Sequence, residues 1–205
     1  MKTLFIEAKH KEIVQLPSKI IEKLPKNIGI ASSIQFIDSL KPVQDQLGNK
    51  SIIAGQILGC NATNADKIKG KVDAFLYIGD GQFHPMAIAI KTKKPVYRYN
   101  PFNKSLDEVQ KTDIERYEKK RMGALSKFLN AKTIGVLTTT KSGQSVSDKR
   151  LKELENKYKD KNFYKFIADT IDYTQLENFP FIEAWVNTAC PRIEEDISIV
   201  NIDQL

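Results

Sequence analysis

Short apolar segments alternate with helix-like segments along most of this sequence, and this alternation is the strongest constraint on its fold. In the first half, apolar segments with the length of buried strands lie at residues 28–31, 51–54, 73–78 and 96–99, and helical patterns at 37–47 and 86–91 lie between them. Strands that alternate with helices require crossover connections, and such connections produce a parallel sheet. The sequence therefore predicts an α/β fold.

The second half of the chain repeats this pattern. Helices are predicted at 106–130 and 147–159, and strands at 133–137, 164–168 and 181–186. The Ile-Gly-Ile sequence at 28–30 matches the Ile-Gly-Val sequence at 134–136, and the strand at 73–78 corresponds to the strand at 181–186 at a similar offset. A match of this kind indicates two copies of one α/β unit.

These copies define the predicted domains. We predict two similar parallel-sheet α/β domains with flanking helices, at residues 1–105 and 106–205. The opening residues 1–26 fit neither copy, because they show only a short strand at 3–8 and a helix at 16–24. A lone strand of this kind indicates the end of another domain, or an edge strand that pairs with a neighbour.

The composition indicates a soluble globular protein. Of the 205 residues, 41% are hydrophobic, which is enough for a core. No stretch approaches roughly 18 consecutive apolar residues, and Glu7 interrupts the segment where a signal peptide needs its apolar centre. We therefore expect a cytoplasmic protein without membrane contact. The net charge of +7 favours negatively charged partners, but scattered lysines are typical of solvated faces and predict no specific nucleic-acid binding.

The two cysteines, Cys60 and Cys190, are the first candidates for chemistry. The apolar run at 181–186 leads into Cys190, and Pro191 stops the strand there because it has no N–H to donate. This places Cys190 at the carboxyl end of a strand, where open α/β sheets bind ligands. The alternative role for a lone cysteine is that of a small buried hydrophobe. In a reducing cytoplasm, two cysteines so far apart in sequence favour a shared metal over a disulfide.

Two loops at strand ends carry further candidates. Gly79, Gly81 and His84 follow the strand at 73–78 and resemble a dinucleotide fingerprint whose third glycine is replaced. The alternative is a tight turn with Pro85 at the start of the next helix. The hydroxyl-rich loop at 138–144 suits a carboxylate or phosphate held by backbone N–H groups, and simple capping of the following helix is its alternative role.

Several of these segments together give the chain a resemblance to a known family. The motifs are Gly-Gln-Ile-Leu-Gly-Cys-Asn at 55–61, Tyr-Ile-Gly-Asp-Gly-Gln-Phe-His-Pro at 77–85, Arg-Tyr at 116–117, Gly-Gln at 143–144 and Val-Asn-Thr-Ala-Cys-Pro-Arg-Ile at 186–193. In this order they resemble the diphthamide-synthesis radical enzymes, the 2-(3-amino-3-carboxypropyl)histidine synthases of the archaeal type. The two cysteine motifs are the most specific part of the resemblance.

The resemblance implies repeated α/β domains around a [4Fe–4S] cluster, to which each of three domains gives one cysteine. Cys60 and Cys190 match the ligands of the second and third domains. The chain therefore resembles a short form that lacks the first domain, and the strand at 3–8 resembles the end of that domain. In the family, three thiolates hold the cluster and leave one iron open for S-adenosylmethionine. This chain has only two matching cysteines, so we expect a partner chain to supply the third.

The implied activity is the first step of diphthamide biosynthesis. By a radical mechanism, an electron from the cluster cleaves S-adenosylmethionine, and the 3-amino-3-carboxypropyl group is transferred to a histidine of translation elongation factor 2. The resemblance also implies an electron donor and an oligomeric assembly. A non-catalytic partner subunit, which supports electron delivery or substrate docking, remains the alternative.

The resemblance extends to a set of site residues. Besides the metal ligands Cys60 and Cys190, it implies cofactor-binding roles for Gln56, Gly79, Gly81, His84, Thr139, Gln144 and Arg192. Among these, Gln56, His84, Gln144 and Arg192 are expected to line the pocket for the sulfonium substrate or the target histidine. The loop at 138–144 is expected to hold the amino-acid end of S-adenosylmethionine.

Overall fold

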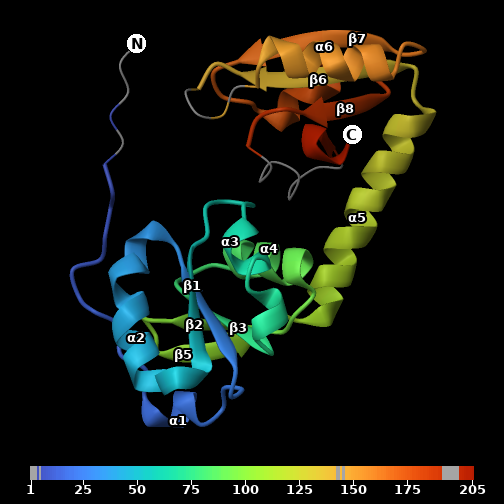
Figure 1. Ribbon diagram of the computed structural model, residues 1–205. Helices are drawn as coiled ribbons and strands as arrows, with labels where there is room; N and C mark the ends of the chain where they lie inside the picture. The colour runs from blue at the N-terminus through green and yellow to red at the C-terminus, as the bar shows by residue number, and fades with distance from the viewer. Residues whose placement is uncertain (1–3, 5, 142–143, 145, 191–198) are drawn as a thin grey trace. The chain divides into compact units, whose positions relative to one another are not determined.

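The computed structural model describes the chain except residues 1–3, 5, 142–143, 145 and 191–198, and it divides into two compact units, residues 1–114 and 115–205 (Figure 1). Each unit contains a sheet with its own core. Helix α5 (Lys111–Asn130) begins in the first unit and continues into the second. In the part of the chain that the structure describes, no helix is long and apolar enough to cross a membrane.

The first unit is built on a five-stranded sheet with the order β2-β1-β3-β4-β5. Neighbouring strands are parallel except for β4 and β5, which are antiparallel. The strands are β1 (Ile28–Ser32), β2 (Ser51–Gln56), β3 (Ala74–Ile78), β4 (Val96–Asn100) and β5 (Ser105–Glu108). The helices are α1 (Ser18–Ile21), α2 (Leu40–Leu47), α3 (Thr63–Asp66) and α4 (Phe83–Thr92), with 3-10 turns at Ile34–Ser39, Gly48–Lys50 and Lys69–Lys71.

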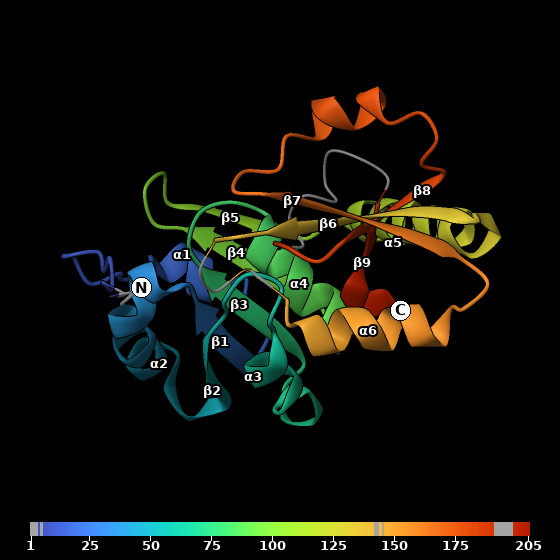
Figure 2. The same cartoon turned by 90° about the horizontal axis from the view of Figure 1, so that it is seen from above.

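Two cores cover the two faces of this sheet. Alternate residues of a strand point to opposite faces, and Ile28 and Ile30 of β1 therefore share a core with α1 and α2. Phe75 and Tyr77 of β3 lie in a second core with residues of α3 and α4. Figure 2 shows α2 and α4 on opposite sides of β1 and β3. The central strands are buried on both faces, as the continuous apolar segments of the sequence predict.

The second unit has a four-stranded parallel sheet with the order β7-β6-β8-β9. Its strands are β6 (Thr133–Thr139), β7 (Asn162–Ala168), β8 (Ala184–Asn187) and β9 (Val200–Asn201); α6 is Asp148–Lys157, and 3-10 turns occupy Tyr173–Asn178 and Ile202–Gln204. Helices α5 and α6 share one core with β6, β8 and β9. Elsewhere in this unit, Phe166, Phe179 and Trp185 form an aromatic cluster with ring centroids 4.6 to 6.3 Å apart.

Both sheets use the same contact between a glycine and an aromatic ring. Gly29 of β1 pairs in register with Phe75 of β3, and a Cβ atom at Gly29 would lie 2.5 Å from the Phe75 ring. Gly135 of β6 pairs with Trp185 of β8, and a Cβ atom there would lie 2.3 Å from the indole. The shared strand order and this shared contact show that the units are two copies of one α/β unit, and the predicted fold class is confirmed.

The structure corrects the predicted start of the long helix at residue 106. Residues 105–108 form β5, because a turn at 101–104 sends the chain back antiparallel to β4. Two asparagine side chains hold this turn: Asn100 accepts from the Phe102 N–H at 2.9 Å, and Asn103 accepts from the Ser105 N–H at 3.0 Å. The helix begins only at Lys111.

The opening segment is partly integrated into the first unit. Within the predicted strand at 3–8, residues 4 and 6–8 form no strand, and the others lie outside the described residues. The predicted helix at 16–24 is a single turn, α1. Val14 and Leu16 are buried in the core, and their N–H groups each donate at 2.9 Å, to Ser39 Oγ and Gln46 Oε1. Within the opening segment, the residues from Val14 onward therefore pack into the core of the first unit.

The glycine contact in the second unit can be tested by substitution. Gly135→Ala should lower the free energy of unfolding of this unit by about 1–3 kcal/mol, because the added methyl group overlaps the Trp185 ring. Trp185 is the only tryptophan, so its fluorescence during denaturant unfolding reports on this unit. Gly123→Ala on α5 is the matched control: a Cβ there meets no atom within 4 Å, and the change should stabilise the helix by up to about 1 kcal/mol. Equal effects of the two substitutions would contradict the proposed contact.

A carboxylate in the second unit gives a test that depends on pH. Glu183 accepts hydrogen bonds from the N–H groups of Thr133 and Lys132, at 2.7 and 2.5 Å, and these bonds hold the pKa of Glu183 below its ordinary value of 4.5. A carboxyl group with a lowered folded pKa stabilises the fold above its unfolded pKa, and this contribution disappears as the pH falls through the folded pKa. Glu183→Gln should therefore lower the melting temperature at neutral pH. The difference from wild type should shrink in acid, and a difference that does not change with pH would contradict the assignment.

Candidate functional site

The carboxyl end of β2 is bent by a bulge. Ile30 of β1 pairs with Ile53, but the next residue, Ala31, pairs with Gly55, so β2 contains one extra residue. Gly55 has a φ of 96°, in the left-handed region that favours glycine. Bulges redirect a strand and are frequent beside functional sites. Gln56, a predicted cofactor-binding residue, ends the strand directly after the bulge.

Cys60 lies on a tight turn a few residues beyond this bulge. The Asn61 N–H donates to the Leu58 carbonyl at 3.0 Å, which closes the turn, and Gly59 inside it has a φ of 59°. The Cys60 side chain is exposed and is not part of a disulfide. The alternative of a buried hydrophobe therefore does not apply to Cys60, and its thiol is accessible to a metal.

The predicted glycine loop connects β3 to α4. Gly79 and Gly81 have φ values of 151° and 78°, and a Cβ atom at Gly79 would lie 2.9 Å from the Tyr77 ring. Both positions therefore need glycine for the backbone itself. The tight turn that the sequence offered as an alternative is present, but Pro85 is the third residue of α4 and not the first, because the helix begins at Phe83. The turn lies at the same sheet edge as Gln56.

His84 lies in the first turn of α4 and stacks on Tyr77. Their ring centroids are 5.6 Å apart, with an angle of 14° between the ring planes. Tyr77 is buried; burial raises the pKa of its hydroxyl, the hydrogen bond with Ser33 lowers it, and the charge of Asp80 raises it further. Stacking fixes the plane of the His84 imidazole at the carboxyl end of β3.

A buried hydroxyl at this sheet edge has no partner in the described part of the chain. Ser32 ends β1 and is 0% exposed, and its Oγ atom has no hydrogen-bond partner there. Its neighbours in register are Gln56 of β2 and Ile78 of β3. Buried polar atoms are almost always paired. The Ser32 hydroxyl is therefore consistent with a bound polar group at this edge of the sheet, which would form a hydrogen bond with it.

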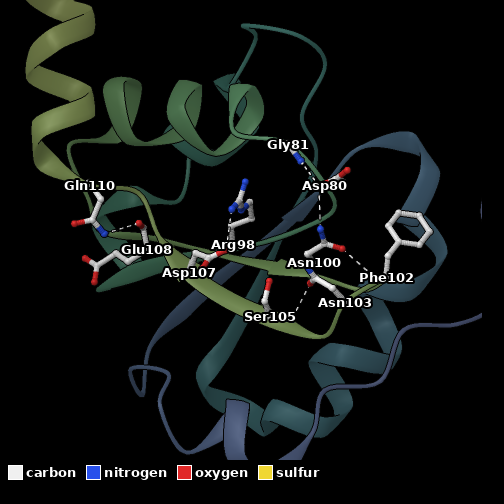
Figure 3. A network of polar contacts seen from close by, with 10 residues as sticks. All are labelled: Asp80, Gly81, Arg98, Asn100, Phe102, Asn103, Ser105, Asp107, Glu108 and Gln110. Carbon is white, nitrogen blue, oxygen red and sulfur yellow. Dashed lines mark hydrogen bonds and ion pairs between the residues drawn. The ribbon is translucent and has the colours of Figure 1, made fainter.

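The first unit also contains a cavity that the sequence did not predict. Its volume is about 240 Å³, and it is lined by Gln82, Pro85, Met86, Arg98, Asp107, Glu108, Val109, Gln110 and Asp113. Figure 3 shows the polar contacts on its wall, where Arg98 donates to Asp107 at 2.7 Å and the Gln110 side chain donates to the Glu108 carbonyl at 2.8 Å. The sequence signal that could have indicated it is Arg98, the one charged residue in strand β4.

Cys190 follows β8 in the second unit and is half-buried. The buried Asn187 side chain fixes the segment before it: its Nδ2 donates to the Cys190 carbonyl at 3.0 Å, and its Oδ1 accepts from the Ala189 N–H at 3.0 Å. The Thr188 hydroxyl donates to the Leu137 carbonyl of β6 at 2.8 Å. These bonds hold Cys190 at the carboxyl end of β8, as the sequence predicts, and the thiol is not part of a disulfide.

The other predicted residues of the second unit are only partly described. Thr139 ends β6 and is buried; its hydroxyl donates to the Asp169 carbonyl at 3.0 Å and accepts from the Lys141 N–H at 3.2 Å. Gln144 is exposed, and its N–H donates to the Lys141 carbonyl at 3.1 Å. The capping alternative for the loop at 138–144 does not apply to its described residues, because the N-cap of α6 is Ser147, which accepts from the Arg150 N–H. Arg192 lies outside the described residues.

Each unit therefore brings predicted residues together at one edge of its sheet. In the first unit these are Cys60, Gln56, His84 and the two glycines, and in the second they are Cys190 and Thr139. Across the described ranges, no group of three His, Cys, Asp or Glu side chains gathers to hold a metal. The two thiols match iron–sulfur ligation in donor type, but two are fewer than such a cluster needs.

The fold and its two thiols define a class of protein built from repeated parallel α/β units, each of which carries a cysteine beyond the carboxyl end of a strand. A comparison with known families makes this specific. The chain belongs to the family described as putative diphthamide synthesis protein, whose model matches residues 1–198.

Named relatives agree with this family. The chain is 36% identical to 2-(3-amino-3-carboxypropyl)histidine synthase of Methanocaldococcus jannaschii, with 96% of this chain and 57% of the relative covered. It is 33% identical to the synthase of Pyrococcus horikoshii, with 86% and 53% covered. A crystal structure of Dph2 from Pyrococcus horikoshii with a 4Fe-4S cluster matches 90% of this chain and 57% of that chain, with a TM-score of 0.75 and 28% identity. The chain thus spans about half the length of these relatives.

Proposed function

We propose that this chain is part of a [4Fe–4S]-dependent transferase that carries out the first step of diphthamide biosynthesis. In this reaction the 3-amino-3-carboxypropyl group moves from S-adenosylmethionine to a histidine of translation elongation factor 2. The observation that carries the proposal is the pair of thiols at strand ends in two copies of a fold similar to cluster-bearing Dph2. We take the two copies, predicted as residues 1–105 and 106–205, as the second and third domains of the family fold.

The donor chemistry of the chain fits a cluster. Cys60 is exposed on a glycine turn, and Cys190 is held by Asn187, so both can act as thiolate ligands. A bound cluster would supply the electron that cleaves the bond between sulfur and the transferred carbon of S-adenosylmethionine. The third thiolate comes from a partner chain, and a separate electron donor reduces the cluster.

The remaining predicted residues bind and orient S-adenosylmethionine. Gln56 and His84 line the pocket from the first unit, and the turn at Gly79 and Gly81 brings the backbone close to the ligand. The loop that contains Gln144 holds the amino-acid end, and Arg192, which lies outside the described residues, keeps its predicted cofactor-binding role. Because the Thr139 hydroxyl is engaged with Asp169 and Lys141, Thr139 acts by holding this loop in place.

A non-catalytic partner subunit is the second candidate. The observation that favours it is the ligand count, since within the described residues no three His, Cys, Asp or Glu side chains come together to hold a metal. Both candidates use the same cysteines and the same cytoplasmic setting. They differ in whether S-adenosylmethionine is cleaved at the site that Cys60 and Cys190 help to form.

The ligand roles of the cysteines can be tested one at a time. Cys60→Ser and Cys190→Ser should each remove most of the bound iron and sulfide from protein purified without oxygen, because a hydroxyl is a poor substitute for a thiolate. Iron, sulfide and visible absorption give the measurement. Melting temperatures of the apo variants serve as the control, and they should match wild type. Full iron content in either variant would remove that cysteine from the ligand set, and a large loss of apo stability in Cys190→Ser would favour the buried-hydrophobe role.

The partner chain is tested by assembly and turnover. The chain alone should bind substoichiometric cluster and cleave S-adenosylmethionine poorly, because two thiolates leave two irons without protein ligands. Addition of a chain that carries the third cysteine should restore both properties in a larger complex. Light scattering measures the assembly, and mass spectrometry of elongation factor 2 measures transfer of the amino-carboxypropyl group. Full activity from a monomeric chain would contradict this prediction.

A further inference from the structure

The internal repeat gives each copy the same register. Gly29 and Gly135 lie at equivalent positions on the central strands, and each accommodates the aromatic residue opposite it, Phe75 or Trp185. Asp80 lies five positions after Phe75, and Cys190 lies five positions after Trp185. Asp80 therefore occupies, beyond β3, the position that Cys190 occupies beyond β8.

The Asp80 carboxylate has a fixed orientation at this position. Its Oδ1 atom accepts from the Gly81 N–H at 2.7 Å and from Asn100 Nδ2 at 2.9 Å (Figure 3). Asn100 is itself fixed, because its Oδ1 accepts from the Phe102 N–H in the turn after β4. Two donors therefore hold one oxygen of Asp80, while the other, Oδ2, accepts no hydrogen bond from the described residues. The residue is exposed.

This arrangement orients a negative charge toward solvent at the edge that also carries Gln56, Cys60 and His84. An aspartate needed only to stabilise the turn could be replaced by a neutral acceptor, because the Gly81 N–H and Asn100 require only one oxygen. Iron–sulfur clusters are held by thiolates, and a carboxylate at this edge therefore suits a cationic ligand better than the iron.

We propose that Asp80 binds a positively charged group of S-adenosylmethionine through Oδ2, and that Asn100 is the positioning residue that orients Asp80. This inference rests on the proposed function, since it specifies how the same site recognises its substrate. The sulfonium and the ammonium of S-adenosylmethionine share the chemistry that a carboxylate recognises, namely a positive charge at close range.

Asp80→Asn tests the charge without removing the turn contacts. The asparagine Oδ1 can still accept from Gly81 and Asn100, so the fold should be retained. Calorimetry on the cluster-loaded protein should show about 10- to 100-fold weaker binding of S-adenosylmethionine, the range for one lost hydrogen bond to a charged group. Asp73→Asn is the matched control. Asp73 directly precedes β3, at its opposite end, and also accepts from an asparagine, Asn27, at 2.9 Å, and its substitution should leave affinity unchanged.

A swapped variant separates binding from structure. In the double variant Asp80→Asn with Asn100→Asp, donor and acceptor are exchanged, so the contact between the two strand ends can form again. The melting temperature should recover relative to Asn100→Asp alone, in which two carboxylates face each other. Affinity for S-adenosylmethionine should stay low, because the charge has moved to β4. Recovery of affinity in the swapped variant would overturn the proposal and make Asp80 a structural residue.

S-adenosylhomocysteine identifies the charged group, because it keeps the ammonium and lacks the sulfonium. If Asp80→Asn weakens the binding of S-adenosylmethionine alone, Oδ2 recognises the sulfonium; if it weakens both ligands equally, Oδ2 recognises the ammonium. Equal affinity of wild type and Asp80→Asn for S-adenosylmethionine would overturn the inference and leave the proposed function intact. A cluster spectrum that changes in Asp80→Asn without any ligand would also overturn it, since Asp80 would then act on the iron. Absence of binding to the wild-type protein would overturn the proposed function together with the inference.

Discussion

The contact between a glycine on a central strand and an aromatic ring on the next strand sets the geometry of both units. A side chain at Gly29 would overlap the Phe75 ring, and one at Gly135 would overlap the Trp185 ring. Each ring can therefore occupy its position only if the residue opposite it is glycine. Interiors are packed to crystal-like density, and a ring that fills the space above a glycine resists sliding along the strand. The register of β3 against β1, and of β8 against β6, is thereby fixed. The proposed chemistry depends on this register, because Asp80 and Cys190 follow these strands within a few residues.

Neutral amide side chains then fix the segments beyond the strands. Asn187 holds the backbone before Cys190, and Asn100 holds the carboxylate of Asp80. An amide donates and accepts at once and does not titrate, so it can join two loops without adding a charge beside a thiolate or a carboxylate. Cys60 is placed differently, by the bulge at Gly55 and the left-handed Gly59, which shape the backbone directly. The backbone conformation therefore positions Cys60, whereas amide hydrogen bonds position Cys190 and Asp80.

The two copies carry different side chains at the ends of their equivalent strands. The first copy places its thiol beyond its second strand, β2, and a carboxylate beyond its third, β3. The second copy places its thiol beyond the equivalent of β3. Each of these groups lies beyond the carboxyl end of a parallel strand, where loops can carry function without disturbing the core.

The sequence by itself determined the parallel α/β class, the two copies and the placement of Cys190 beyond a strand, because these follow from local periodicity and from repeated glycine positions. Pro191 is not what ends that strand, since β8 ends at Asn187. The cysteine and glycine motifs of the sequence also identified the family. Only the tertiary structure decided that residues 105–108 form an antiparallel strand, that Thr139 is bonded to Asp169, and that Arg98 borders a cavity with Asp107. It also decided that Asn100 reaches Asp80 across twenty positions of sequence. The physical reason is range: periodicity and turn chemistry act between neighbours in the chain, whereas these contacts join residues that only the packed register of the strands brings together.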